Sequence, residues 1–409
     1  MTPQIFPPEM CSRRAFVLAS GLFVAGSMVS CTGFDEEIGQ TAIQTREKLL
    51  LGHVFIRVRI GKHTQKVVIG ETTITRYRGK WNGASSSQNN NVEIELKPNT
   101  VVTIAGQRKK ISGILVLHPR AEVSTRAFDV VAHISLEQYL PGVLAGELFA
   151  HWHPSTFAAQ AIAARSYAIN HHLERKSKSH FDVTDGTASQ MFLGDVTLDV
   201  AHRAVQETKG IVLSWNDKII PAYYCACCGG LAATAVDAIS SAEQHKIPPL
   251  EGHGGQDICT ALDIHSWSAK RSARVLRKRL NACATTMNLP SFANIRTIRS
   301  IEPTTTNQHG RPTQLVIYGR RHEMTEVRAR DFIRAVNAPV PSLPAATEQV
   351  WSSFLVGEKN GSKLEIDGFG MGHGVGLCQY GAQELAGKGT SWEDILEWYY
   401  PKASISTHI

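Results

Sequence analysis

The sequence has no low-complexity tract, and only 19% of its 409 residues are charged. Beyond its first thirty residues it also has no apolar run long enough to cross a bilayer, for which about 20 residues are needed. These absences exclude a disordered or fibrous protein and one that crosses a membrane repeatedly. Hydrophobic residues make up 43% of the chain. We therefore expect ordinary globular cores, in domains of roughly 150 residues each.

Positive charge is concentrated in one part of the chain. Residues 46–126 contain 15 Lys and Arg against 5 Asp and Glu, a net charge of +10, although the whole chain has a formal net charge of only +7. Such a segment suits an anionic polymer or surface. It is equally consistent with a solvated face that binds nothing. We expect no nucleic-acid partner.

The first 31 residues carry an export pattern. A twin-arginine motif, Arg13-Arg14, precedes an apolar run over residues 15–29, which is short for a membrane span. The four residues that end at Cys31 resemble a lipobox. We therefore expect residues 1–31 to be a lipoprotein-type signal segment, with Cys31 as the lipidation site.

Export places the mature chain outside the cytoplasm. The alternatives to lipidation are a plain signal peptide and an uncleaved anchor, and both lead to the same compartment. Residues 32–47 have the character of a tether. Thr32 stands where an aspartate marks inner-membrane retention in many didermic bacteria. We therefore expect a lipid anchor at the periplasmic face of the outer membrane.

Six cysteines lie outside the signal segment. In an oxidising compartment an even number favours disulfides, but the pairing does not follow from the sequence. A metal is the other interpretation, with His265 as a further ligand, although regular zinc spacing is missing. The six are Cys225, Cys227, Cys228, Cys259, Cys283 and Cys378.

The hydrophobic pattern predicts an α+β fold. Short β-type runs separated by Gly, Asn and Ser indicate a small, basic, β-rich domain over residues 48–125. A mixed α/β domain follows over residues 126–409, with an irregular inserted subdomain at about 239–345. The predicted strands are 54–60, 66–69, 92–96, 101–104, 113–117 and strand-like runs within 206–224 and 295–318. The predicted helices are 135–148, 155–173, 267–285 and 329–336.

The first predicted helix carries a carboxyl group on its apolar side. Ser135 and Gln138 form a capping-box pair at its start. Glu147 lies four residues after Val143 and seven after Leu140, so it shares the buried stripe. Burial and the negative end of the helix dipole both disfavour its charge, so we expect a raised pKa. General acid catalysis needs such a carboxyl group, although a glutamate at a helix end can also simply reach solvent.

Two further segments place polar residues among small ones. The alanine-rich second helix contains Gln160, Arg165 and Tyr167, and its alanines allow close packing. Arg165 is there either a structural ion-pair partner or a substrate clamp. Residues 368–382 have glycine at alternate positions, which lets another backbone or a ligand approach. His373 in this segment is either a ligand contact or part of the packing.

Seven segments in order resemble the stage II sporulation protein D and amidase-enhancer (SpoIID/LytB) family. The first contains Glu147 and is similar to the family's "EYL-GVV-SEM" opening. A single match of this kind is weak, whereas seven in order identify the chain as a member of the family. The matching segments are 136–148, 159–168, 181–185, 204–210, 228–230, 368–382 and 399–401.

The resemblance implies a peptidoglycan lytic transglycosylase that needs no cofactor. Glu147 matches the catalytic glutamate. It would protonate the oxygen between N-acetylmuramic acid and N-acetylglucosamine, and then take the proton from the muramoyl 6-hydroxyl as a 1,6-anhydro end forms. The substrate supplies its own nucleophile, so the second carboxylate of an ordinary glycosidase is not required. The other matching positions, expected to line the glycan cleft, are Gln160, Arg165, Tyr167, Gln190, His373, Gln379 and Tyr380.

The chain departs from the family at its thiol and histidine positions. Some relatives carry a cysteine and a His-Cys pair linked to zinc, where this chain has Thr184, Ala188 and Ser189, so we expect no metal there. By resemblance to relatives that pair two cysteines further along, we expect a disulfide between Cys228 and Cys259.

A second departure follows the glutamate. The family motif continues there with a methionine and a proline, whereas this chain has Leu148 and Phe149.

Two other functions stay open. The first is a non-catalytic glycan-binding protein that recruits or stimulates an amidase. The second is a metal-storage or redox module built on Cys225, Cys227 and Cys228. The expected partners are peptidoglycan glycan strands, a cell-wall amidase, and the membrane through the lipid anchor.

Overall fold

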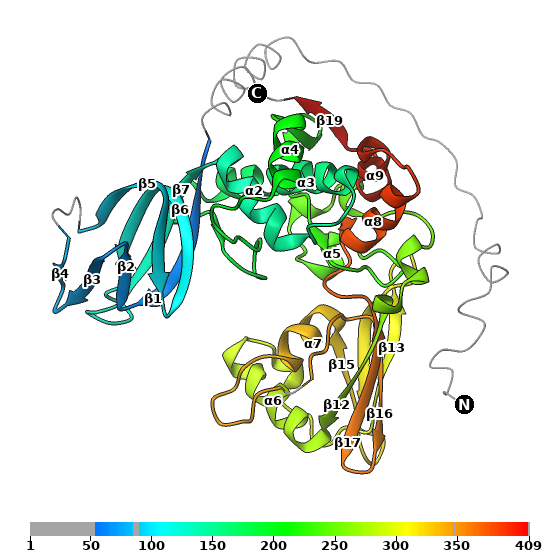
Figure 1. The fold of residues 1–409 in the computed structure, drawn as a ribbon. Coiled ribbons are helices and arrows are strands. Elements are labelled where there is room, and N and C mark those ends of the chain that lie inside the picture. Colours follow the sequence, from blue (N-terminus) through cyan, green and yellow to red (C-terminus); the bar gives the residue numbers. More distant parts are fainter. Residues whose placement is uncertain (1–53, 85–89, 347, 408–409) are drawn as a thin grey trace, which may run out of the picture.

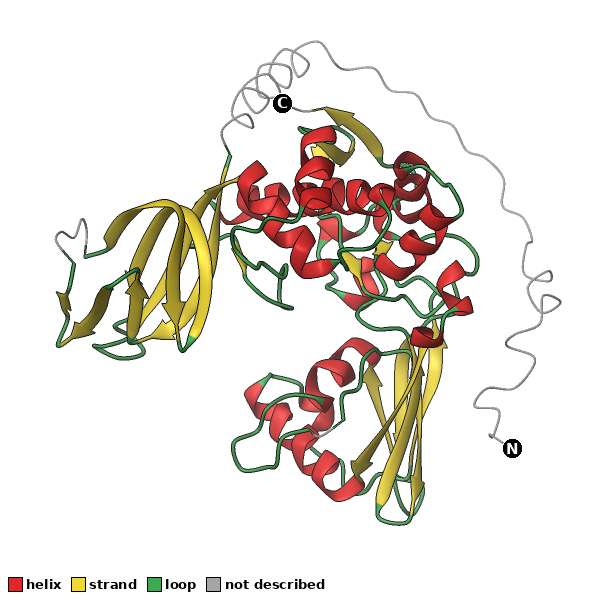
Figure 2. Ribbon diagram, in the orientation of Figure 1, coloured by secondary structure: helices red, strands yellow, loops and turns green. Residues whose placement is uncertain are grey.

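The computed structural model describes residues 54–84, 90–346 and 348–407. The predictions for residues 1–31, Cys31 and the tether at 32–47 fall outside this range. The described chain forms an N-terminal sheet, a central helical unit and a second α/β unit (Figures 1 and 2), and the α+β class is confirmed. None of the helices in this part of the chain combines the length and the apolarity that a bilayer span requires.

The N-terminal unit is an eight-stranded sheet with the order β4-β3-β2-β5-β6-β7-β1-β8. It continues past the predicted boundary at residue 125 to Ser135, because β7 pairs with both β6 and β1. The predicted strands 92–96 and 101–104 are one strand that bulges between Leu96 and Thr100. The strands are β1 (Phe55–Thr64), β2 (Lys66–Ile69), β3 (Thr72–Tyr77), β4 (Lys80–Asn82), β5 (Val92–Ile104), β6 (Gln107–Pro119), β7 (Phe128–Ser135) and β8 (Val183–Thr184).

The central unit is built around one buried helix, α3. Its residues 156–169 are buried on all sides, because α2 and α4 pack on one part of it and α8 and α9 on another. Small alanines permit these close approaches, as predicted. The helices are α2 (Leu136–Glu147), α3 (Pro154–Arg175), α4 (Asp199–Glu207), α5 (Ala235–Ala238), α8 (Gln379–Gly387) and α9 (Trp392–Tyr399).

Short strands and single turns complete this unit. They form a three-stranded sheet, β10-β9-β19, and a parallel pair, β11 and β18. The strands are β9 (Ile211–Trp215), β10 (Lys218–Ile219), β11 (Tyr224–Cys225), β18 (Leu377–Cys378) and β19 (Ser404–Thr407). The 3-10 turns are η2 (Glu243–His245), η3 (Pro248–Leu250), η4 (Ile258–Ala261) and η5 (Asp263–His265).

The inserted unit is an antiparallel sheet with the order β12-β17-β16-β13-β14-β15, and α6 and α7 pack on it around a separate core (Figure 1). It runs to Phe369, beyond the predicted end at 345. Residues 266–272 form a strand rather than the predicted helix, because they pair with β17 along their whole length. The elements are β12 (Ser266–Ser272), α6 (Ala273–Thr286), η6 (Pro290–Phe292), β13 (Ser300–Thr306), β14 (Pro312–Tyr318), β15 (Met324–Arg328), α7 (Ala329–Val336), β16 (Leu355–Asn360) and β17 (Lys363–Phe369).

The start of α2 differs from the prediction. The Ser135 hydroxyl donates to Gln138 Oε1 at 2.7 Å and makes no hydrogen bond to the helix N–H groups, so the capping box is not formed. The Leu136 N–H instead donates to the Val54 carbonyl, which extends the sheet into the first turn of the helix. The β-sheet therefore satisfies one free N–H of the first turn, although not one that the capping box would have bonded.

Buried aspartates join the N-terminal sheet to the central unit. Arg57 donates to Asp182, which is fully buried and also accepts from His172 at 2.9 Å. Asp129 is fully buried beside Arg59 and Arg120, at 3.6 and 2.8 Å. Several positive charges of residues 46–126 are therefore neutralised by aspartates from outside that segment, one close to its end in sequence and one 56 residues beyond its end.

Arg165 joins the helices of the central unit. Its side chain is fully buried, and its Nε and Nη2 atoms each lie 2.9 Å from one oxygen of Glu137 on α2. It also donates to the carbonyls of Val205 and Ile211, at 3.3 and 3.2 Å. One guanidinium group thus links α2, α3, α4 and the start of β9.

Replacing Arg165 with alanine should lower the free energy of unfolding by roughly 3–5 kcal/mol, because it leaves the partners of a buried ion pair unsatisfied. Denaturation in urea measures the change. The matched control is Lys246→Ala, which removes the exposed ion pair with Glu243 and should cost less than about 1 kcal/mol. Equal costs for the two variants would show that Arg165 has no such structural role.

Candidate functional site

Glu147 is the last residue of α2, and its side chain is half-buried. The helix ends there because Leu148 is extended, with φ −121° and ψ 153°. The predicted position of Glu147 on the buried side of the helix is confirmed. A carboxyl group in this position needs hydrogen-bond donors from elsewhere in the chain.

The first donor comes from a loop that packs directly on α2. A Cβ atom at Gly142 would lie 2.2 Å from the Gly194 carbonyl oxygen, and one at Gly146 would lie 2.7 Å from that of Met191. The two glycines therefore let the loop at 190–194 approach the helix. As a result, the Met191 N–H donates to Glu147 Oε1 at 2.7 Å.

Two side chains from later in the chain also donate hydrogen bonds to the Glu147 carboxyl group. Gln379 Nε2, at the start of α8, donates to Glu147 Oε2 at 3.2 Å. The Tyr224 hydroxyl, on β11, donates to Oε1 at 3.4 Å. Burial raises the pKa of Glu147 above its ordinary value, although the three hydrogen bonds act in the opposite direction. The predicted direction of the shift is confirmed.

A buried hydrogen-bond chain lies beneath the carboxyl group. The Tyr139 hydroxyl donates to Gln190 Oε1 at 3.1 Å, and Gln190 Nε2 donates to the Ala164 carbonyl at 3.2 Å. Both side chains are fully buried. Gln190 thus fixes the 190–194 loop between α2 and α3. The prediction that its side chain lines an open cleft is therefore wrong.

Aromatic rings surround the tyrosine that binds Glu147. The ring centroid of Tyr167 lies 5.8 Å from that of Tyr223 and 6.3 Å from that of Tyr224. His373 meets the edge of Tyr223 at 6.0 Å. Burial lowers the pKa of His373 to about 4, and its Nδ1 accepts from the Val375 N–H at 3.0 Å. The imidazole is therefore neutral at neutral pH and carries its proton on Nε2.

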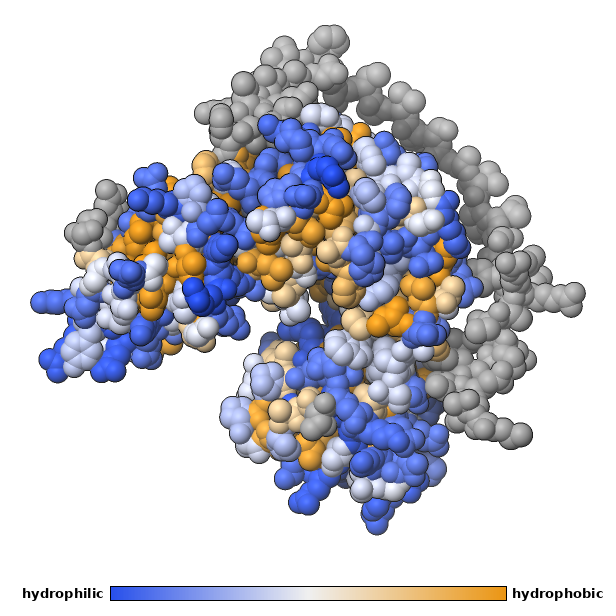
Figure 3. Space-filling view, in the orientation of Figure 1, coloured by the Kyte–Doolittle hydropathy of each residue, from blue (hydrophilic) through white to orange (hydrophobic). Residues whose placement is uncertain are grey.

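An aromatic cluster follows Glu147 in the chain and packs against Tyr380, the residue after Gln379. Phe149 follows Glu147 by two residues and is 53% exposed. Its ring lies 5.4 Å from that of Trp152, which in turn contacts Tyr380 edge-on at 5.0 Å. Figure 3 shows that apolar side chains gather over the central unit on the face drawn, whereas the outer ends of the two flanking units are mostly hydrophilic.

The structure brings together most, but not all, of the predicted residues. Glu147, Gln379 and Tyr380 lie at one place, with Tyr167 and His373 behind Tyr224 and Tyr223. Arg165 is fully buried and its guanidinium is engaged by Glu137, so its predicted role in the cleft is wrong. Gln160 is also fully buried, and neither polar atom of its amide has a partner among the described residues.

Sequence reasoning missed several members of this site. It did not identify the Met191 N–H, which no side-chain motif can reveal, or the rings of Tyr224 and Trp152. The sequence did carry one signal for the aromatic side chains of the site, namely Phe149, an apolar residue just after the end of a helix. Tyr224 could have been found from its place beside the cysteine-rich motif.

The predicted disulfide is not formed. The Cys228 and Cys259 sulfur atoms are neighbours at 3.6 Å but are not bonded, and all six cysteines in the described part of the chain are free and buried.

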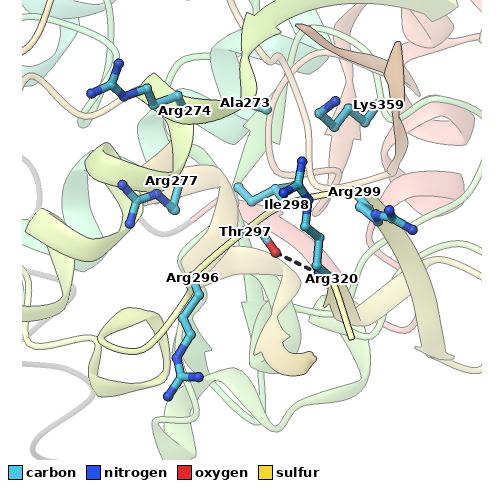
Figure 4. Close-up of a pocket in the computed structure, with 9 residues that line it drawn as sticks. All are labelled: Ala273, Arg274, Arg277, Arg296, Thr297, Ile298, Arg299, Arg320 and Lys359. Atoms are coloured by element: carbon cyan, nitrogen blue, oxygen red, sulfur yellow. Dashed lines mark hydrogen bonds between the residues drawn. The ribbon is translucent and has the colours of Figure 1, made fainter. Parts of the chain in front are cut away.

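A polar concavity lies on the inserted unit, away from Glu147 in the chain (Figure 4). It has a volume of about 420 Å³. Arg320 closes one side of it, with its backbone N–H on the Thr297 hydroxyl at 2.7 Å. Its lining contains no Asp or Glu, and its positive charge suits an anionic group. Its lining residues are Ala273, Arg274, Arg277, Arg296, Thr297, Ile298, Arg299, Arg320 and Lys359.

Comparison with known proteins matches the segment that contains Glu147 to one family. Residues 124–215, which include Glu147, match the family described as Stage II sporulation protein, or SpoIID. The chain is 25% identical over 348 residues to the Stage II sporulation protein D of Bacillus subtilis, covering 75% of this chain and 91% of that protein. The chain belongs to the SpoIID/LytB family.

Other relatives of this SpoIID/LytB member match over less of their length. An uncharacterized protein of Brachyspira hyodysenteriae is 30% identical over 274 residues, which is 66% of each chain. The Amidase enhancer of Bacillus subtilis is 27% identical over 295 residues, which is 66% of this chain but only 40% of the enhancer. Residues 250–376 match a domain of unknown function that includes the inserted unit.

The pKa of Glu147 predicts a specific dependence of stability on pH. Its pKa is above the ordinary value of 4.5 in the folded protein, so the folded state holds this proton more tightly than the unfolded state. The parent protein should therefore lose unfolding free energy, relative to Glu147→Gln, as the pH rises from below the ordinary pKa through the raised one. Urea denaturation of both proteins from about pH 4 to about pH 8 measures the difference.

Glu397→Gln, which removes an exposed carboxylate of α9, is the matched control for this series. A difference between Glu147→Gln and the parent that does not change with pH would contradict the raised pKa.

Proposed function

We propose that this protein is a lytic transglycosylase that cleaves peptidoglycan glycan strands, with Glu147 as the only acid and base. The observation that carries the proposal is the state of its carboxyl group. It is half-buried, its pKa is raised, and each of its oxygens accepts from neutral donors. A carboxyl group in this state can hold a proton near neutral pH and give it to a substrate oxygen.

The proposed reaction needs one carboxyl group and no water. Glu147 gives its proton to the glycosidic oxygen, the bond from that oxygen to C1 of N-acetylmuramic acid breaks, and N-acetylglucosamine leaves with a free 4-hydroxyl. The muramoyl 6-hydroxyl then bonds to C1, and the carboxylate of Glu147 takes its proton. The products are a 1,6-anhydromuramoyl end and a regenerated acid.

The neighbours of Glu147 suit both halves of this cycle. Among the described residues, its hydrogen-bond partners are a backbone N–H, an amide and a phenol. Gln379 and Met191 stabilise the anion that forms after the first proton transfer, and burial favours its return to the acid form.

The aromatic surface supports binding of a sugar. Phe149, two residues after the acid, presents an exposed ring, and Tyr380 and Trp152 pack against it. Sugar rings have an apolar face that can stack on such a surface. We therefore assign the sugar unit next to the cleaved bond to this surface, which consists of Phe149, Trp152 and Tyr380.

A second function is a non-catalytic glycan-binding protein that stimulates an amidase. The observation that favours it is the printed name of one relative, Amidase enhancer, at 27% identity. In that case the same aromatic surface would bind glycan without cleavage. The replacement of Glu147 separates the two functions.

We propose that the protein is exported and held by a lipid at Cys31, at the periplasmic face of the outer membrane. The twin-arginine motif and the lipobox-like residues before Cys31 support this location. A tether over residues 32–47 would let the described units reach the peptidoglycan layer.

Glu147→Gln should abolish release of muropeptides from purified peptidoglycan, because the amide cannot transfer the proton. Loss of one proton-transfer group costs a factor of ~10²–10⁴ in rate. Product release followed by liquid chromatography measures it. The Glu397→Gln variant should digest at the parent rate, and binding of Glu147→Gln to the polymer should be unchanged. Equal digestion by Glu147→Gln and the parent would refute the assignment of the acid.

We propose that two basic regions hold the enzyme on the polymer, whose stem peptides carry carboxylates. One is the arginine-lined concavity of the inserted unit, and the other is the basic segment at residues 46–126. The triple variant of Arg274, Arg277 and Arg320 to Gln should weaken sedimentation with sacculi. The triple variant of Lys62, Lys66 and Lys80 should do the same. Both losses should be largest at low salt, because the Debye length falls from ~10 Å at 0.1 M to ~3 Å at 1 M.

The control for these variants removes the same charge from another surface. Arg203, Lys209 and Lys218 are exposed near α4 and β10, and their replacement with Gln should leave sedimentation unchanged. Binding that does not respond to salt, or an equal loss with the control variant, would show that the two basic regions are only solvated surfaces.

A further inference from the structure

Four thiol groups meet between the central unit and the inserted unit. Cys227 and Cys228 follow β11, Cys259 lies in η4, and Cys378 ends β18 directly before α8. The sulfur atoms of Cys228 and Cys259 are 3.6 Å apart, and those of Cys228, Cys259 and Cys378 all lie within 4.8 Å of one another. Cys227, which precedes Cys228, is fully buried in the same cluster of side chains as these three cysteines. Three distant parts of the chain therefore contribute to one buried cluster.

The spacing of the sulfur atoms suits one tetrahedral metal ion. Zinc–sulfur bonds of about 2.3 Å place the sulfurs of a tetrahedron about 3.8 Å apart. A disulfide needs about 2.05 Å, and forming one here would leave two buried thiols beside it. Iron–sulfur clusters hold several iron atoms and hence need more space than these sulfurs enclose.

A buried arginine gives independent support. Arg311 is 1% exposed and comes from the turn between β13 and β14. Its Nη1 donates to the carbonyls of Cys228 and Leu231, but its Nε and Nη2 atoms have no hydrogen-bond partner, and it forms no ion pair among the described residues. A buried positive charge needs a counter-charge. Four neutral thiols do not supply one, whereas a divalent ion with four thiolates has a net charge of −2.

Backbone donors also prepare the cluster for thiolates. The N–H groups of Cys228 and Gly381 approach the Cys378 sulfur at 3.3 and 3.4 Å. Such N–H donors to ligand sulfurs are typical of the second shell of metal sites.

Asp257 is the other group within reach, and its oxygens are already used. Oδ1 accepts from the Cys259 N–H at 2.8 Å, and Oδ2 accepts from the Tyr399 hydroxyl at 2.7 Å. The carboxylate orients the turn that carries Cys259, and one of its oxygens also lies within 4.8 Å of the sulfurs of Cys228, Cys259 and Cys378. We assign the fourth position to Cys227, which is fully buried in the same cluster, and the variants below distinguish it from Asp257.

We propose that Cys227, Cys228, Cys259 and Cys378 together bind one structural zinc ion. The proposal depends on the thiols and on Arg311, not on the glycan activity. The site differs in residues and in place from the zinc positions of relatives, which are Thr184, Ala188 and Ser189 in this chain. Because Cys378 precedes Gln379, the ion would also fix the end of α8 that holds the Glu147 carboxyl group.

The test is the metal content of the full chain, purified without chelator. Mass spectrometry of the metals should find about one zinc ion per chain. Cys259→Ser and Cys227→Ser should each lower this to less than about a tenth. Cys283→Ser removes a buried thiol of α6 that lies outside the cluster and should keep the zinc, as should Asp257→Asn.

A second measurement does not depend on whether the variants fold. Replacement of zinc by Co²⁺ in the parent protein should give the strong visible and near-ultraviolet absorption of tetrahedral cobalt with thiolates. Metal-free protein with a Cys228–Cys259 disulfide in non-reducing peptide maps would overturn the proposal, and so would stoichiometric iron. Loss of zinc in Asp257→Asn but not in Cys227→Ser would overturn the four-sulfur ligand set.

Discussion

The site depends on how a half-buried carboxyl group at the carboxyl end of a helix obtains its hydrogen bonds. The helix dipole and burial both oppose a negative charge on Glu147, so donors must come from outside α2. They come from the loop at Met191 and from Gln379 and Tyr224, which lie far apart in the chain. The glycines of α2, the parallel pairing of β11 with β18 and the start of α8 all serve to bring these donors to one place.

Buried ion pairs fix the framework around this place. Arg165 joins four elements of the central unit through Glu137 and backbone carbonyls, and Asp182 joins that unit to the N-terminal sheet through Arg57. The same pairs change the interpretation of net charge. The excess of positive charge in residues 46–126 is real in the sequence, but part of it faces aspartates in the fold. Charge counted along a segment therefore overstates the charge that a partner would meet.

What the sequence predicted follows from local physics, and what it missed depends on distant contacts. The period of apolar residues predicted the helix at 329–336, the long alanine-rich helix and the buried position of Glu147. It could not show that Arg165 would meet Glu137 of α2 or that Gln160 would be fully buried, because both depend on which elements pack against α3. Residues 266–272 have a helical pattern, but pairing with β17 overrides it. The convergence of Cys378 with Cys228 likewise requires the folded chain.

The central claim is that Glu147 transfers a proton in both directions while the substrate provides the nucleophile. The most direct measurement is the mass of the muramoyl ends that the parent protein releases from purified peptidoglycan. The mechanism produces ends one water lighter than reducing ends, because the 6-hydroxyl closes onto C1. Digestion that releases predominantly 1,6-anhydromuramoyl ends agrees with the account. Predominantly reducing muramoyl ends would contradict it, because a water molecule would then have attacked C1.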